Sequence, residues 1–352
     1  MRSGSEGPGD ATRWSRWTRR VVRKAGELLV GARAAVTNPR AALYRWSAPT
    51  GNERLLRLVT AWPVTVPDKI RWKMVRDRRP LLGDFADKVE AKRYVARVAG
   101  AEYTVPMLAV FDDASSLDTG GVPDEFVVKV THASKGVVIV RHDAPREARL
   151  PEPGGPLDRC SVRPEAFDVA RAREVFAGWL AEPFGVRNGE WAYSVHRPRI
   201  VAEPLLRMTS GRPIRDVMCF VANGRVVMVQ VAEERPDGDG HVSSRYLPDG
   251  THLGHVRGRS YRSWYRPPPP SPLPLPASLA EMIDVAQRVA RETDFLRVDM
   301  LDLGDRFLVG ELTNYPNAGM SKIVPTSFSR WLGSQWTLPA SYGDELGGAH
   351  LR

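Results

Sequence analysis

The chain has 352 residues, of which 42% are hydrophobic, with a formal net charge of +10 and a pI of about 9.8. This length suits two or three domains with sizeable cores, and no apolar run is long enough to span a membrane, because Arg33 interrupts the best candidate at residues 28–36. The two cysteines lack metal-ligand spacing, and the N-terminal arginines precede no long apolar core of a signal peptide, so we expect a cytoplasmic protein.

Residues 1–50 carry much of the excess positive charge and predict a basic, partly disordered N-terminal arm. Residues 1–12 have a composition typical of disorder, whereas residues 13–36 have an amphipathic helical pattern with interspersed Trp14 and Trp17. Such an arm can contact an anionic membrane surface, bind nucleic acid, or serve only as a solubilising extension or extra helix. We predict peripheral membrane contact through residues 13–36 and rank nucleic acid last, because the charge concentrates in the arm rather than on aromatic-rich strands.

The next part of the chain predicts a helix followed by three strands. Asp87 is the expected N-cap of a helix that Gly100 ends. Strands are expected at residues 107–111, 126–130 and 136–140, and the short polar link between the last two predicts a hairpin.

Two lysines in this part occupy unusual positions. Lys129 lies in the middle of an apolar strand, where a buried ammonium needs an anionic partner such as a nucleotide phosphate. The alternative is that Lys129 points to solvent from a half-exposed strand. Lys88 opens the helix, an unfavourable end for a cation. A bound phosphate would offset that cost, although a first-turn lysine can also be merely solvated.

The second half of the chain continues with mixed strands and helices. In chain order we expect a loop at 143–160, a helix at 165–182, a strand at 199–206 bending at Pro204, a hairpin of 216–222 and 225–231, a loop-rich region at 235–260, a stiff proline-dense connector at 267–276 and a helix at 279–293. Glu203 ends one of these strands. Its carboxylate can accept a hydrogen bond from an adenine amino group, or it is an ordinary edge-strand glutamate.

Two carboxylates then lie in neighbouring apolar strands. Asp299 belongs to the run at 295–303 and Glu311 to the run at 307–312, and Gly304-Asp305 predicts a tight turn between them. Buried carboxylates that lie close together repel and need neutralisation, which a divalent cation with hard oxygen ligands such as Mg²⁺ can supply. The alternative is ion pairing with a nearby arginine, Arg297 or Arg306.

The succession of antiparallel hairpins and helices predicts an α+β fold and excludes a simple doubly wound nucleotide fold. Neither a Walker A loop nor a GxGxxG motif is present in the sequence. The order Lys, Lys, Glu, Arg-x-Asp and Glu resembles the ATP-grasp superfamily. The local sequence motifs are most similar to those of one branch, the ATP-grasp proteins that resemble the teichuronopeptide biosynthesis protein TupA. This similarity covers roughly residues 60–340. The stretches that carry this resemblance are 68–80, 85–95, 123–132, 189–191, 198–203, 297–299 and 310–313.

The resemblance implies an ATP-grasp fold in which two α+β lobes clamp ATP, preceded by the basic helical arm. It implies an N-terminal region and linker at 51–120, the two lobes at 121–340 and a tail at 341–352. The implied roles are phosphate contacts for Lys88, Lys129 and the loop residue Ser134, adenine contacts for Glu203, Leu205 and Leu206, Mg²⁺ ligation by Asp299, Glu311 and Thr313, and contact of Arg297 with the transferred phosphoryl group.

The implied activity is that of an ATP-dependent carboxylate–amine ligase acting through an acyl-phosphate in cell-surface polysaccharide or peptide-conjugate assembly. Its substrates would be small-molecule or polymer carboxylates and amines. The sequence departs from the branch at Met218, where a lysine is usual, and at Thr313, where the superfamily often has asparagine. Two alternatives therefore remain: an ATP-dependent kinase of a sugar or polymer hydroxyl, and a degenerate domain that binds nucleotide without catalysis.

Overall fold

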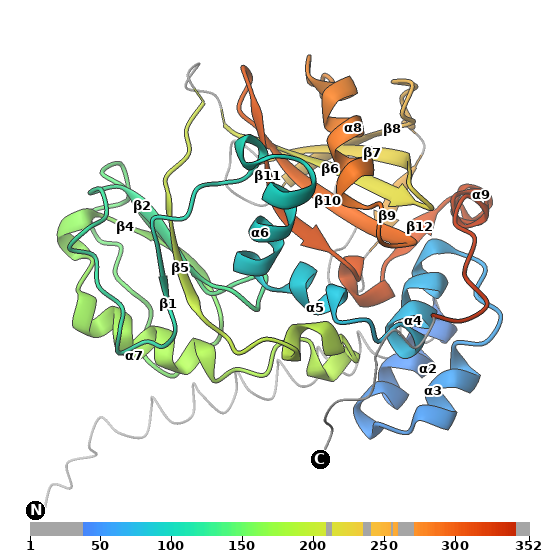
Figure 1. Cartoon of the computed structure of the whole chain (residues 1–352), viewed down its shortest axis with the longest axis horizontal. Coiled ribbons are helices and arrows are strands. Elements are labelled where there is room, and N and C mark those ends of the chain that lie inside the picture. Colours follow the sequence, from blue (N-terminus) through green and yellow to red (C-terminus); the bar gives the residue numbers. More distant parts are fainter. Residues whose placement is uncertain (1–37, 209–212, 235–240, 255, 260–270, 343–352) are drawn as a thin grey trace, which may run out of the picture.

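The computed structural model describes residues 38–208, 213–234, 241–254, 256–259 and 271–342 (Figure 1). The expected disordered segment and amphipathic helix of residues 1–36 lie outside these residues. No helix in the described ranges has the length and apolar character needed to cross a membrane.

Two five-stranded sheets organise the described chain (Figure 1). The first has the order β1-β5-β2-β3-β4 and is antiparallel except for the β3–β4 pair; the second has the order β11-β10-β6-β7-β8 and is antiparallel throughout. A small two-stranded sheet joins β12 to β9. The strands are β1 (Ala109–Phe111), β2 (Phe126–Val130), β3 (Val137–Val140), β4 (Arg159–Val162), β5 (Ile200–Pro204), β6 (Arg215–Ala222), β7 (Arg225–Glu234), β8 (His241–Tyr246), β9 (Arg257–Arg259), β10 (Phe295–Asp302), β11 (Phe307–Thr313) and β12 (Lys322–Val324).

The helices cover the sheets and build a unit at the N-terminal end of the described chain. They are α2 (Pro39–Ser47), α3 (Glu53–Val59), α4 (Val66–Arg76), α5 (Leu81–Ala86), α6 (Lys88–Val98), α7 (Val169–Leu180), α8 (Leu279–Val289) and α9 (Thr326–Ser334), with short 3-10 turns η1 (Ala48–Thr50), η2 (Ala101–Tyr103), η3 (Pro164–Ala166), η4 (Val186–Asn188), η5 (Trp191–Ser194) and η6 (Pro316–Gly319). The α7 side chains form one core with the first sheet, whereas α8 and the helices α4 to α6 share a larger core with the second.

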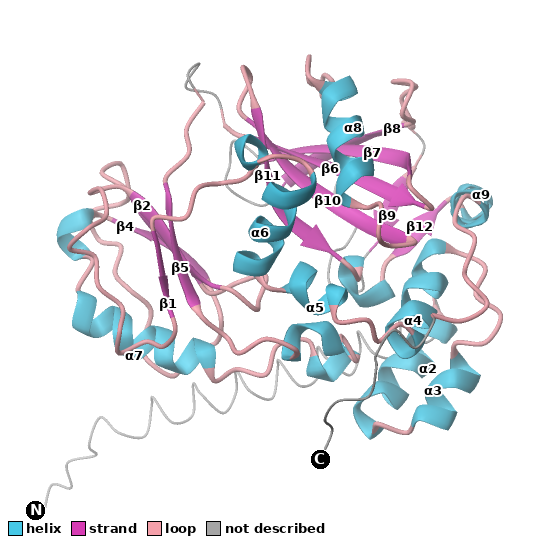
Figure 2. Cartoon of the chain, viewed as in Figure 1, coloured by secondary structure: helices cyan, strands magenta, loops and turns pink. Residues whose placement is uncertain are grey.

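The helix α6 lies between the two large sheets (Figure 2). Asp87 caps it as expected, because its Oδ1 accepts from the backbone N–H groups of Val89 and Glu90 at 3.0 Å. The Lys88 backbone N–H donates to the Thr131 carbonyl beyond β2, and the helix also packs against β11. The helix α6 is therefore held between the end of β2 in the first sheet and β11, the edge strand of the second sheet.

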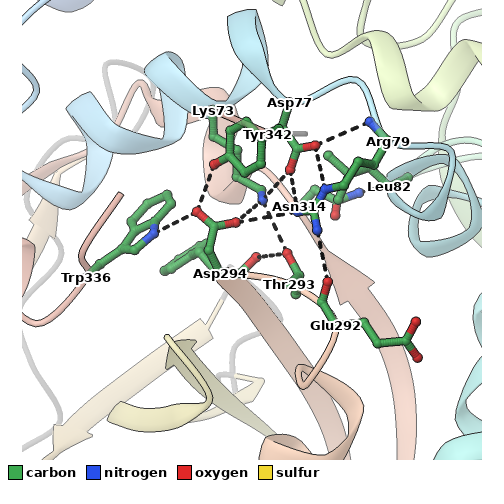
Figure 3. Close-up of polar contacts among 11 residues, drawn as sticks. Lys73, Asp77, Arg79, Leu82, Glu292, Thr293, Asp294, Asn314, Trp336 and Tyr342 are labelled. Carbon is green, nitrogen blue, oxygen red and sulfur yellow. Dashed lines mark hydrogen bonds and ion pairs between the residues drawn. The ribbon is translucent and has the colours of Figure 1, made fainter. Parts of the chain in front are cut away.

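A buried ion cluster fixes the helical unit to the second sheet (Figure 3). Lys73 of α4 is fully buried and pairs with Asp77 at 2.7 Å and with Asp294, which immediately precedes β10. The same Asp294 carboxylate accepts from Trp336 Nε1 at 2.9 Å and from the Tyr342 hydroxyl at 2.8 Å. One buried cluster thus joins α4, the start of β10 and the C-terminal part of the described chain.

Most of the predicted elements are present, including the α+β alternation and the hairpins that β2–β3, β6–β7 and β10–β11 form. The prediction of a loop-rich region at 235–260 is wrong for β8, which pairs along β7. Its polar residues lie at the edge of the sheet, where a strand needs no apolar alternation. The predicted strand at 107–111 and helix at 165–182 are shorter, beginning at Ala109 and Val169.

Residues 38–50 pack with the fold, although the sequence places them in the arm. They form α2 and η1, and Tyr44 and Ala48 are buried in the larger core. The reason is that the arginines of this segment point outward while Ala41, Tyr44 and Ser47 make a buried stripe.

Candidate active site

The two predicted carboxylates lie directly opposite each other in the second sheet. Asp299 of β10 is the cross-strand partner of Glu311 on β11 and of Met218 on β6, and Met218 is in turn opposite Gln230 on β7. Directly opposite residues in an antiparallel sheet share a face. The neighbours Val298 and Met300 point to the buried core, so this row lies on the other, half-buried face.

Asp299 is paired with an arginine, which is the alternative left open by the sequence. Arg297 donates from Nε to Asp299 Oδ1 at 2.6 Å and from Nη2 to Oδ2 at 2.5 Å, and it also reaches the Thr313 hydroxyl at 3.1 Å. Burial raises the pKa of Asp299 to about 6, against the opposing effect of Arg297, and Glu311 adds to the rise. The charge of the Asp299 carboxylate therefore depends both on its pairing with Arg297 and on the neighbouring Glu311 carboxylate.

Glu311 has a different environment from Asp299. The described residues give it no ion pair, and its hydrogen-bond contact is with the Thr313 hydroxyl, which donates to Oε1 at 3.5 Å. A second contact of the same hydroxyl reaches Asp299 Oδ2 at 3.4 Å. The predicted ligand set of Asp299, Glu311 and Thr313 is thus brought together, with Glu311 its least engaged carboxylate.

The first sheet contributes a buried carboxylate held by two lysines. Glu203 of β5 pairs with Lys129 of β2 at 2.8 Å and with Lys92 of α6 at 3.0 Å. Burial by itself raises the pKa of Glu203, but the two ammonium groups outweigh it and hold that pKa below its ordinary value. Burial also lowers the pKa of Lys92 to about 8, even though Glu203 supports the charged form.

Lys88 lies on α6, the helix between the two large sheets (Figure 2). Its ammonium donates to the carbonyl oxygens of Thr131 and Ala133 at the end of β2. Burial lowers the pKa of Lys88, Glu311 and Glu203 counteract this change, and Lys129 adds to it. The helix that carries Lys88 also packs against β11, the strand of Glu311, so Lys88 lies between the end of β2 and the strand that carries a predicted metal ligand.

Other predicted residues are less closely associated with this group. Ser134 is exposed in the turn between β2 and β3 and has no hydrogen bond to the described residues. Leu205 and Leu206 follow β5, and Leu206 packs on a small cluster with Leu303 and Leu308. Lys92 and Lys129 both pair with the Glu203 carboxylate. Contact of Glu203 with adenine therefore stays a prediction.

Three residues near the site were not predicted from the sequence. Lys92 lies one turn after Lys88 on α6, a spacing that could have placed both on one face. Asp216 lies two residues before Met218 on β6, on the same side of the strand. Burial raises its pKa, while charges on both sheets, including Arg159 of β4, act on it.

Tyr193 lies in the irregular segment η5, where no periodicity could have predicted its place. Burial raises its pKa, and the Glu311 charge raises it further.

The oxygen ligands suit Mg²⁺ held jointly with a phosphate. Within the described ranges, no three His, Cys, Asp or Glu side chains converge on one metal position. Mg²⁺ is commonly bound by one or two carboxylates together with substrate phosphates and water. Glu311 and the Thr313 hydroxyl meet that requirement as they stand, whereas Asp299 would have to release one contact with Arg297.

The position of the usual lysine is apolar in this chain. Met218 contacts the neighbouring strand through its sulfur, which accepts from Gln230 Nε2 at 3.4 Å. A thioether is a weak acceptor and carries no charge. Position 218 therefore cannot supply the phosphate contact expected from a lysine. Arg215, the cation on β6 that could replace it, is paired with Asp302.

The family model described as TupA-like ATPgrasp matches residues 68–147 and 159–337. No curated protein matches the chain. Among solved structures, a D-alanine–D-alanine ligase from Bacillus anthracis complexed with ATP has 12% identity and a TM-score of 0.35, the alignment covering 66% of this chain and 56% of that one.

Two further solved structures are similar at the same low level. The ATP-grasp ligase PsnB complexed with a minimal precursor has 12% identity and a TM-score of 0.37, covering 86% of this chain and 75% of that chain. A D-alanine–D-alanine ligase from Helicobacter pylori has 12% identity and a TM-score of 0.35, covering 73% and 60%. All these TM-scores are low, and the family assignment rests on the family model.

Proposed function

The chain belongs to the TupA-like ATP-grasp family, and from this premise we propose that it is an ATP-dependent carboxylate–amine ligase. The observation that carries the proposal is the position of α6: its Lys88 ammonium donates to carbonyl groups at the end of β2, the strand of Lys129, and the helix packs against β11, the strand of Glu311, with Asp299 and Thr313 beside Glu311. Cations that can hold phosphates thus face carboxylates that can hold a metal. We propose that the enzyme works in cell-surface polysaccharide or peptide-conjugate assembly, as the branch implies.

The residues divide between binding and stabilisation. Lys88 and Lys129 would hold the ATP phosphates, and the chain at residues 204–206 would hold the adenine. Asp299, Glu311 and Thr313 would hold Mg²⁺, which when bound neutralises developing charge on the phosphoryl oxygens. Arg297 would lie beside the transferred phosphoryl group and stabilise its charge.

The proposed reaction has two steps and needs little acid–base machinery. A substrate carboxylate oxygen attacks the γ-phosphorus and ADP leaves, which gives an acyl-phosphate. The amine of the second substrate then attacks the acyl carbon, phosphate leaves, and the nitrogen loses a proton to solvent. What the protein supplies is positioning and cationic stabilisation, which Lys88, Lys129 and Arg297 are placed to give.

A second candidate is a nucleotide-binding protein without catalysis. Met218 favours it, because the charge that a lysine would bring to β6 is missing. The bidentate pairing of Asp299 with Arg297 also favours it, because that carboxylate is already neutralised.

Hydroxamate trapping separates these functions. Full-length protein is incubated with ATP, Mg²⁺, hydroxylamine and a panel of amino acids, uronic acids and acidic peptides, and ADP and hydroxamate are measured. A ligase gives both products with its donor carboxylate and loses both when Mg²⁺ is chelated. A kinase gives ADP with a phosphate ester and no hydroxamate, and a non-catalytic protein gives neither.

The variant Glu311→Gln tests the site within this assay. Because Glu311 is the carboxylate without an ion pair among the described residues, we expect ADP release to fall by at least about a hundredfold. Asp305→Asn, in the exposed turn of the same hairpin, is the matched control and should retain full turnover. Normal ADP release from Glu311→Gln would reject the metal assignment.

We also propose that residues 13–36 make peripheral contact with anionic membrane while the catalytic lobes remain in the cytoplasm. The support is the arginine and lysine content of the segment together with Trp14 and Trp17.

A further inference from the structure

An unusual number of apolar side chains is exposed on the first two described helices and the loop after them. Five of the eleven exposed large apolar residues in the described ranges lie between residues 43 and 64. They are Leu43, Trp46, Leu58, Trp62 and Val64, with exposed fractions of 46%, 70%, 65%, 78% and 44%. We call these residues, with Arg40, Arg45, Arg54 and Arg57, the α2–α3 surface.

The α2–α3 surface occupies a corner of the molecule. The helices α2 and α3 contact each other and lie beside α4, away from the first sheet (Figure 1). Leu43 and Trp46 are one turn apart on α2, on the side opposite buried Ala41 and Tyr44. The Arg40 guanidinium donates to the Trp62 carbonyl at 3.2 Å, which holds the loop carrying Trp62 next to the start of α2.

Trp62 is held in an unfavourable backbone conformation. Its φ of +53° lies in the left-handed region, which is costly for a bulky side chain. The indole is 78% exposed, so packing within the protein does little to offset that cost. A strained residue that displays a large ring to solvent is typical of a contact site.

The surface also carries net positive charge. Arg40, Arg45, Arg54 and Arg57 are exposed on α2 and α3. Two acids offset part of their charge, because Glu53 pairs with Arg57 at 2.8 Å and Asp68 lies 3.8 Å from Arg40. Tryptophan prefers the boundary between lipid headgroups and acyl chains, where arginine can contact anionic headgroups. The sequence that immediately precedes α2 brings further arginines to the same end of the chain.

We propose that the α2–α3 surface is a docking site for an anionic lipid bilayer. Trp46 and Trp62 insert their rings at the headgroup level together with Leu43 and Leu58, and the arginines contact lipid phosphates. This site is distinct from residues 13–36 and does not depend on the ligase proposal, because the nucleotide-binding residues lie elsewhere, between the two sheets.

Vesicle sedimentation of the full-length protein tests the proposal. The vesicles contain phosphatidylcholine and phosphatidylglycerol in roughly a 3:1 ratio, with pure phosphatidylcholine for comparison. Wild-type protein should bind the anionic vesicles, and binding should weaken as salt rises. The double variant Trp46→Ser/Trp62→Gly should lower the partition coefficient at least about tenfold, and Arg54→Ser should lower it about fivefold.

Two measurements separate loss of docking from loss of folding. Glycine suits the left-handed conformation, so Trp62→Gly alone should keep or raise the melting temperature while it weakens vesicle binding. Trp331→Ser, which removes a half-exposed tryptophan from α9, is the matched control and should bind as wild type.

Three results would overturn the proposal. Full-length protein that ignores anionic vesicles at low salt has no membrane-docking surface. Unchanged binding by Trp46→Ser/Trp62→Gly, with binding lost when Arg19, Arg20 and Arg23 are replaced by serine, assigns docking to the arm alone. A wild-type dimer in light scattering that Trp62→Gly converts to a monomer, without vesicle binding, makes the surface an interface between copies of the chain.

Discussion

At the scale of single residues, Glu203 shows how the site keeps a carboxylate charged. The carboxylate is buried between Lys129 and Lys92, and two cations are more than its neutralisation needs. We interpret Lys92 as a positioning residue. It can stay with Glu203 while Lys129 turns to a phosphate, so that nucleotide binding does not leave a buried carboxylate unpaired.

The variant Lys92→Met tests this interpretation. Without Lys92, Glu203 would retain Lys129, and ATP affinity should fall by about 1–2 kcal/mol, as when a charged hydrogen bond is lost. Calorimetry of ATP binding measures the change. Lys135→Met, in the exposed turn before β3, is the matched control, and equal affinities for the two variants would contradict the role of Lys92.

The same variant should differ from wild type in pH dependence. Lys92 has a pKa of about 8 because burial disfavours its ammonium, so wild-type ATP affinity should approach that of Lys92→Met as pH rises through about 8. In the unfolded chain, the Lys92 ammonium keeps its proton until the pH reaches the ordinary lysine pKa of 10.5. Between these two values the unfolded state binds more protons, so the contribution of Lys92 to stability rises with pH. Urea unfolding of both proteins across this window measures it.

At the scale of elements, the hairpin of β10 and β11 could be predicted closely from sequence. Its two apolar runs and the Gly304-Asp305 turn predict that the two strands pair, and the Asn223-Gly224 turn does the same for β6 and β7. The exact partners also depend on a β-bulge in each hairpin, between Asp299 and Met300 and between Phe220 and Val221, which the sequence did not predict. Because of the first bulge, Asp299 lies opposite Glu311 rather than Gly310.

Other features depended on distant contacts. The strand β8 has polar residues at a sheet edge, and only its pairing with β7 identifies it. Tyr193 reaches the site from an irregular segment, and Lys92 became informative only when the structure placed Glu203 beside it. The sequence also could not decide between a metal and Arg297 as the partner of Asp299, because both fit a buried carboxylate.

The strand β6 gives a prediction of its own. Met218 is half-buried beside Asp299 in the cross-strand row, so a lysine there would have a carboxylate within reach and space on the same face. Met218→Lys should raise ATP affinity by about 1 kcal/mol or more. Met218→Leu is the isosteric control. Equal affinity of both variants to wild type would show that this position does not contact the nucleotide.

At the scale of the whole molecule, the buried cluster around Lys73 holds the parts of the site in place. It fixes α4 to the start of β10 (Figure 3), and the chain continues from α4 through α5 to α6, which carries Lys88 and Lys92. The cluster around Lys73 therefore helps to position both the helix that carries Lys88 and Lys92 and the strand that carries Asp299. Arg79 strengthens the cluster by pairing with Asp77 at 2.7 Å.

Removing the central ammonium should destabilise the entire fold. In Lys73→Met, Asp77 and Asp294 would lose the fully buried cation that separates them, and the free energy of unfolding should fall by about 3–5 kcal/mol. Urea unfolding measures the loss, and Arg288→Met, which breaks an exposed pair with Asp284 on α8, should cost less than about 1 kcal/mol. In Lys73→Met, Asp77 keeps its close pair with Arg79 at 2.7 Å, whereas Asp294 keeps only the longer 3.7 Å contact with Arg79. Adding Asp294→Asn removes this poorly compensated charge, so the double variant should recover part of the loss. If Lys73→Met unfolds at the same urea concentration as wild type, the cluster does not anchor the helical unit, and the placement of α6 must depend on its apolar contacts with β11 and α8.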